Sequence, residues 1–277
     1  MSATMSHIPS ELIDEIIDRI NADIYSLMTC STVSKAWLPR SRHHIFGRLC
    51  LQPSTSAKFF ELVDSPLSTI APYVRHLVLT RTYGGGGQLW FPGVLPRLIT
   101  FTALLSCTLT LANFVPFKGD LTPIFASSFR LLSHLALSRC RFKSFAQFTD
   151  VMCACPNLES FASTDLSWNA DDAFSDPKHI RLSRHPLLRA LNLCGDGKGA
   201  VLNWLRLGAS PPRVSRLVIT WLYLEDPECF GAFLRALGPS LVDLEMTVHS
   251  ENSIPSRPVR YDALHPRLIR INRTTLP

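Results

Sequence analysis

The sequence predicts an α/β protein in which a small helical unit precedes a curved parallel sheet with helices on its outer side. Two observations lead to this fold class. Residues 8–46 carry apolar side chains at helical spacing, and the chain after them repeats one short strand pattern at a nearly constant interval. With 277 residues, of which 46% are apolar, the chain can also build a large core. We therefore expect two domains, residues 1–46 and residues 47–277.

The first predicted helix lies in residues 10–20. Its apolar residues form one wide stripe that consists of Leu12, Ile13, Ile16, Ile17 and Ile20. Pro9 stands at the first turn, where its fixed φ suits the start of a helix. We expect a second helix to start from Asp23 as its N-cap, and a third to run from about Ser31 through Trp37 to Phe46. Roughly 40 residues can hardly fold alone, so this unit should lean on a neighbour or a partner.

The chain from residue 46 onward repeats the pattern apolar-x-x-apolar-x-apolar, in some copies imperfectly. The middle residues of nine copies are Leu49, Leu77, Leu109, Leu135, Phe161, Leu191, Leu217, Leu244 and Ile271, at intervals of 26 to 32 residues. This period is typical of leucine-rich repeats, a solenoid in which each repeat adds one parallel strand to the sheet and a helix or an irregular turn to its outside. Helices are expected over residues 144–153, 200–207 and 229–237.

The third copy has two competing registers. Leu98-x-x-Phe101 is one, and Ser106-x-x-Leu109-x-Leu111 is the other. We prefer the second, because it makes the following interval 26 residues, an interval that two other repeats share.

Strand geometry predicts a recognition surface. Side chains alternate along a strand, so the residues between the repeated apolar positions should face the open, concave side of the sheet. This face is mostly small and polar, with charge toward its C-terminal half. The candidate substrate-binding residues are His134, Asn192, Arg216, Asp243, Glu245 and Arg270. The Asp165–His185 segment and the Gly84–Gly87 turn are alternative recognition surfaces.

The N-terminal residues resemble an F-box, and in particular the F-boxes of fungal proteins. The resemblance rests on Ile8-Pro9-x-Glu11-Leu12, on the apolar residues that follow, and on residues 30–46 with Trp37. It covers about a sixth of the chain, and its first position holds Ile8 where the family more often has Leu. F-box domains dock on the SKP-type adaptor of cullin-RING ubiquitin ligases. The resemblance therefore implies an adaptor contact through Ile8, Pro9, Leu12, Ile16, Leu27, Val33 and Trp37.

The resemblance also implies that the solenoid recruits a protein substrate, and that the adaptor links the chain to a cullin. Two alternatives remain open: a scaffold that uses the F-box outside any ligase, and a basic repeat protein that binds nucleic acid. A net charge of +6 favours the second. However, Arg and Lys are spread along the chain without interleaved aromatic residues, so we expect no nucleic-acid partner. The simplest alternative is a helical unit that binds nothing.

Other classes of function find no support in the sequence. We find no nucleophile elbow, zinc-protease helix or nucleotide loop, so we expect no catalytic residues and no cofactor. The eight cysteines lack metal-ligand spacing, which predicts no metal. Residues 98–117 carry no charge and are long enough to span a bilayer, but Thr, Ser, Asn and Pro interrupt the stretch, so we expect no membrane span. The N-terminus reads as a helix rather than a secretory signal, and we expect a cytoplasmic or nuclear protein.

Overall fold

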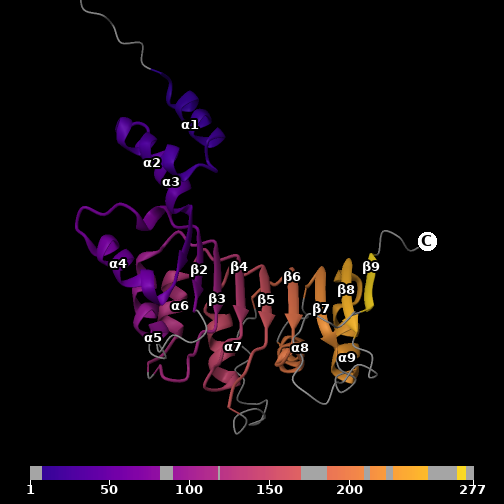
Figure 1. Ribbon diagram of the computed structural model, residues 1–277. Coiled ribbons are helices and arrows are strands. Elements are labelled where there is room, and N and C mark those ends of the chain that lie inside the picture. Colours follow the sequence, from indigo (N-terminus) through magenta and orange to yellow (C-terminus); the bar gives the residue numbers. More distant parts are fainter. Residues whose placement is uncertain are drawn as a thin grey trace, which may run out of the picture.

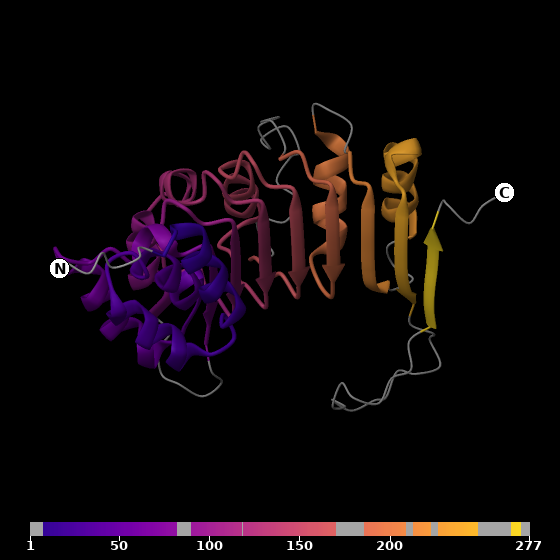
Figure 2. The ribbon, with the colours of Figure 1, turned by 90° about the horizontal axis from the view of Figure 1, so that it is seen from above.

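The protein is an α/β structure, seen in a computed structural model that describes residues 8–81, 90–117, 119–169, 186–208, 213–222, 227–248 and 267–272. Three N-terminal helices stand at one end of a row of strands (Figure 1). The other helices line one side of that row (Figure 2). The Gly84–Gly87 turn and most of the Asp165–His185 segment lie outside the described residues.

The three N-terminal helices are α1 (Ser10–Arg19), α2 (Ile24–Val33) and α3 (Leu38–Gly47). The predicted cap of α2 is confirmed, because Asp23 accepts hydrogen bonds from the backbone N–H of Tyr25 at 3.0 Å and from Ser26 Oγ at 2.6 Å. The predicted third helix is wrong at its start. The chain leaves the helix at Ser34 and re-enters it at Leu38. Pro39 explains this, since it lacks an N–H and is tolerated only in the first turn of a helix.

The strands form one sheet in which neighbours in space are neighbours in sequence. They are β1 (Arg48–Leu51), β2 (His76–Thr80), β3 (Ser106–Thr110), β4 (His134–Ser138), β5 (Ser160–Thr164), β6 (Ala190–Cys194), β7 (Arg216–Leu222), β8 (Asp243–Val248) and β9 (Arg267–Asn272). Strands β1 to β8 run parallel, as predicted. The buried positions alternate with open ones, as in the pattern of β2 and β4.

Strand β9 corrects the prediction of a ninth parallel repeat. Ile271 does pair with Leu244, but β9 runs antiparallel to β8. A parallel return needs a crossover that covers the sheet, usually with a helix. The sequence between β8 and β9 carries Pro255, Pro258 and Pro266, and proline is the poorest helix former.

The register of β3 corrects both readings of the third repeat. Cys107 pairs with Leu77, and Leu109 pairs with Leu79, so the repeat is Leu104-x-x-Cys107-x-Leu109. The preferred register was therefore two residues out. Because side chains alternate with a period of two, this shift leaves Thr108 on the open face, as expected. Cys107 escaped the pattern because a cysteine behaves as a small apolar residue in a slot that usually holds leucine.

The remaining helices cover the buried face of the sheet. They are α4 (Pro53–Asp64), α5 (Trp90–Val94), α6 (Thr122–Ser128), α7 (Phe145–Cys153), α8 (Lys198–Leu207) and α9 (Pro227–Leu237), with 3₁₀ turns η1 (Ala71–Tyr73), η2 (Leu95–Thr100) and η5 (Gly238–Ser240). The three helices predicted in this region correspond to α7, α8 and α9. Ser144 caps α7 by accepting the backbone N–H of Gln147 at 3.2 Å. No helix in the described ranges is long and apolar enough to cross a bilayer.

A row of aromatic side chains joins the repeats inside the core. Phe114, Phe142 and Trp168 each follow a strand at the same offset, next to the bridges that link Asn113 to Arg141 and Arg141 to Ser167. The rings of Phe114 and Phe142 stack with centroids 4.5 Å apart. The same offset in three repeats gives the core a continuous aromatic layer, which the strand pattern alone does not reveal.

Candidate protein interaction surfaces

The apolar residues of α1 divide into an inner and an outer stripe. Ile13 and Ile17 are buried and form a small core with Leu27, separate from the large core under the sheet. The outer stripe consists of Ile8, Leu12 and Ile16, all exposed. The single wide stripe in the sequence is therefore shared between a core and a free surface, and only the inner half is needed to fold the unit.

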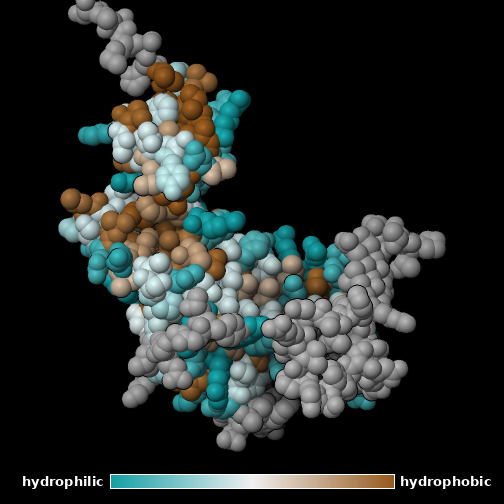
Figure 3. All heavy atoms as spheres, viewed as in Figure 1, coloured by the Kyte–Doolittle hydropathy of each residue, from teal (hydrophilic) through white to brown (hydrophobic). Residues whose placement is uncertain are grey.

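Helix α2 adds further exposed apolar side chains. These are Ile24, Tyr25, Met28 and Val33. In the space-filling view, apolar side chains gather over the N-terminal helices (Figure 3). Exposed apolar residues that gather in this way usually mark a place where another protein binds. We call these four residues and the outer stripe of α1 the apolar surface of α1 and α2.

The structure separates the predicted adaptor-binding residues into two groups. Ile8, Pro9, Leu12, Ile16 and Val33 are exposed. Two others are not.

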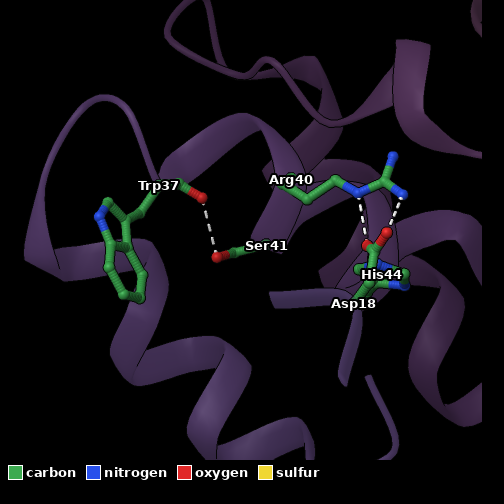
Figure 4. A network of polar contacts seen from close by, with 5 residues as sticks. All are labelled: Asp18, Trp37, Arg40, Ser41 and His44. Atoms are coloured by element: carbon green, nitrogen blue, oxygen red, sulfur yellow. Dashed lines mark hydrogen bonds and ion pairs between the residues drawn. The ribbon is translucent and has the colours of Figure 1, made fainter. Parts of the chain in front are cut away.

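Leu27 differs from the exposed residues, because its side chain is only 1% exposed and lies in the small core. In this position it holds α2 against α1. Trp37 is half-buried and packs against the same core. Its carbonyl accepts the backbone N–H of Ser41 at 3.2 Å and the hydroxyl of Ser41 at 2.9 Å, which fixes the start of α3 (Figure 4).

An ion-pair network ties α1 to α3. Arg40 donates from Nε to Asp18 Oδ1 at 2.6 Å and from a terminal nitrogen to Oδ2 at 2.5 Å, while His44 Nε2 lies 2.7 Å from Oδ1 (Figure 4). These hydrogen bonds, first that of Arg40 and then that of His44, hold the pKa of the Asp18 carboxyl well below its ordinary value. The two-pronged pair fixes the angle between α3 and α1, the helix that carries part of the apolar surface.

The open face of the sheet presents three rows of side chains. The first row consists of Arg48, His76, Ser106, His134, Ser160, Ala190, Arg216 and Asp243. The second consists of Cys50, Val78, Thr108, Ala136, Ala162, Asn192, Val218 and Glu245. The third runs from Thr80 to Thr247 and is almost entirely Ser and Thr. Small side chains dominate the middle strands, so the backbone of a partner could approach them closely.

The structure brings four of the predicted substrate-binding residues together. Asn192, Arg216, Asp243 and Glu245 lie on the consecutive strands β6, β7 and β8. However, Arg216 Nε is 3.5 Å from Asp243 Oδ2, so these two charges largely compensate each other. This end of the face carries less unpaired charge than the sequence suggests.

The other two predicted residues lie apart from this group. His134 stands on β4, two strands away from β6, with its Nδ1 2.7 Å from Ser133 Oγ. Arg270 pairs through its backbone with Glu245, but its side chain lies outside the described part of the molecule. The predicted set is therefore not one site.

Sequence reasoning missed two sets of residues. Ile24 and Met28 are spaced by one helical turn after the Asp23 cap, so their periodicity could have revealed an apolar face on α2. The second set consists of Arg48, Arg75 and His76, on β1, directly before β2 and on β2. No pattern within a short segment of the sequence indicates that they lie together. These residues meet only because β1 and β2 pair in register.

Two buried cysteine thiols are poor candidates for chemistry. Burial raises the pKa of Cys140 to about 12, and it raises the pKa of Cys155 to about 12. A thiol of this kind stays protonated and unreactive at neutral pH. Across the described residues, no group of three or more His, Cys, Asp or Glu side chains is placed to hold a metal ion.

Comparison with models of known protein families gives no match, and no curated protein matches the sequence. The interpretation of both surfaces therefore rests on the residues and their geometry.

Proposed function

We propose that this protein is the substrate receptor of a ubiquitin ligase built from an SKP-type adaptor and a cullin. In this proposal α1, α2 and α3 form an F-box that docks on the adaptor. The sheet and its helices form a degenerate leucine-rich solenoid whose open face recruits a protein substrate. The chain itself carries out no chemistry. It contributes proximity, by holding the substrate near the subunits that transfer ubiquitin.

The observation that carries this proposal is the exposed outer stripe of α1. Leu12 is 51% exposed although a complete small core lies directly behind it. Fully burying a side chain of this size is worth about 1.5–3 kcal/mol relative to leaving it exposed. About half of each side chain in this stripe remains uncovered, and a docking unit would gain binding energy by burying that half.

The leading alternative is an interaction scaffold that uses the same apolar surface outside any ligase. The apolar surface of α1 and α2 favours both functions equally, so only the wider assembly distinguishes them. A role in binding nucleic acid is less well supported. No aromatic ring except imidazole stands on the open face of β1 to β6, so this face lacks a stacking platform for bases.

The test is a binding measurement between the purified full-length chain and a purified SKP-type adaptor. Leu12→Asp should weaken binding about thirtyfold, because a buried anchor at an interface contributes about 2 kcal/mol. Leu62→Asp on α4 is the matched control, since Leu62 is also 51% exposed and lies outside the apolar surface. Its affinity should equal that of the wild type.

The outcomes separate the alternatives. An unchanged affinity in Leu12→Asp would refute the docking mode. An adaptor complex that does not recruit a cullin would point to the scaffold instead.

A further inference from the structure

The described open face holds a cluster of arginine and histidine side chains beside the N-terminal helices. Arg48 and His76 are paired in the first row of β1 and β2, and His134 follows in the same row on β4. Arg75 precedes β2, and its backbone N–H donates to the carbonyl of Gly47 at 3.1 Å. We call Arg48, Arg75, His76 and His134 the basic row.

Little negative charge balances the basic row. Among the described residues that begin β1 to β6 or directly precede them, Glu159 supplies the only carboxylate, whereas Arg48, Arg75 and Arg189 supply three guanidinium groups. None of the ion pairs described in the structure involves Arg48 or Arg75. This contrasts with the far end of the face, where Arg216 and Asp243 pair with each other.

The electrostatics of His76 agree with this arrangement. Burial lowers the pKa of His76, and the neighbouring charges of Arg48, His134 and Arg75 lower it further. No carboxylate acts in the opposite direction. A negative charge brought by a partner would therefore meet the cations of Arg48 and Arg75 and little competition from carboxylates.

We propose that the basic row binds an acidic segment of a protein partner, rich in Asp or Glu, that lies in an extended form against the open face of β1 to β5. The groups that can receive an anion are spread along the face: the guanidinium groups of Arg48 and Arg75, and the imidazoles of His76 and His134 as hydrogen-bonding groups. His76 and His134 stand two strands apart, which corresponds to about 10 Å. Several spaced carboxylates suit this geometry better than one compact anion does.

The side chains around the basic row favour the same partner. Thr108, Ala136, Ser138 and Ala162 are small, so they let an extended backbone come close, and the hydroxyl groups can hydrogen-bond to it. Single-stranded nucleic acid would need aromatic side chains for its bases to stack on. If this partner is the substrate that the ligase recruits, the inference rests on the proposed function; the binding of the acidic segment itself does not.

The test is fluorescence anisotropy with the purified full-length chain and a short labelled peptide of alternating Glu and Ser. A peptide of alternating Gln and Ser is the neutral control. We expect the acidic peptide to bind and the neutral peptide not to bind, with an affinity that falls as salt is added. Arg48→Glu should weaken binding about fivefold or more, because it removes an ion pair with the peptide and adds a repulsion between two carboxylates. Arg206→Glu on α8 changes the net charge equally and should leave binding within twofold.

Three outcomes would overturn the proposal: equal binding of both peptides, equal effects of the two substitutions, or tighter binding of a single-stranded oligonucleotide that also depends on Arg48. If Arg48→Glu unfolds the chain, Arg48→Gln with His134→Gln tests the same row without adding a negative charge. Adaptor affinity is measured on the same samples. Peptide binding without adaptor binding would reject the proposed function and keep this inference. Adaptor binding without peptide binding would keep the proposed function and reject this inference.

Discussion

Replacing Phe142 by Ala tests whether the repeats are coupled through the aromatic layer. Phe142 is fully buried. Its ring stacks on Phe114 at 4.5 Å and meets Phe148 edge to face at 5.5 Å. A buried Phe→Ala change costs about 3–5 kcal/mol through lost burial and the cavity left behind. Phe142→Leu keeps most of the apolar volume and loses the ring contacts, so it should cost about 1–2 kcal/mol.

The assay combines urea unfolding with amide hydrogen exchange. Lys143→Ala is the control, because this neighbouring side chain is exposed and its loss should change the free energy of unfolding by no more than about 0.5 kcal/mol. In an array where each strand contacts only its neighbours, Phe142→Ala should accelerate exchange first in β3, β4 and β5. The N-terminal helices have their own core, so their protection and their adaptor affinity should stay unchanged.

Two results would refute this reasoning. One is a Phe142→Ala protein as stable as Lys143→Ala, which would mean that the aromatic layer does not stabilise the repeats. The other is a loss of protection that is equal in every strand and in α1, which would mean that the whole chain unfolds as one cooperative unit.

Two further substitutions test local features. Asp18→Asn should lower the free energy of unfolding by about 1 kcal/mol at neutral pH, a modest figure because the Asp18 side chain is 39% exposed. Folding lowers the pKa of Asp18, so the stabilisation by its carboxylate is complete above the ordinary carboxyl pKa of 3.8 and is lost as the pH falls below that value. The free energies of unfolding of the mutant and the wild type, measured with urea, should therefore converge in acid. A constant difference down to low pH would contradict the ion-pair assignment. Gly195→Ala should destabilise the fold by more than about 1 kcal/mol, because Gly195 has a φ of 70° and a Cβ there would stand 1.8 Å from Asp165 Oδ1. A melting temperature equal to that of the wild type would contradict this.

The fold was largely predictable because its strongest signals are local and repeated. Leu135 and Leu137 recur at a fixed spacing in neighbouring repeats, and the alternation along each strand assigns one face to the core. Errors arose where a single residue departed from the rule. Cys107 replaced the expected leucine, and Pro39 moved the start of α3. The direction of β9 was not predictable from its apolar pattern, because an antiparallel strand shows the same alternation as a parallel one.

The sequence by itself determined the three N-terminal helices, the order of the strands and which side chains of the strands point away from the core, since these depend on periodicity within short segments. Only the tertiary structure decided how the apolar residues of the N-terminal helices divide between core and surface. It placed Leu27 inside and Leu12 outside, although both are leucines on helices of the same small unit. It also joined Arg48 to His76 and neutralised Arg216 with Asp243. Each of these pairs is formed by residues that lie 27 or 28 positions apart, and only the register of neighbouring strands brings them within reach.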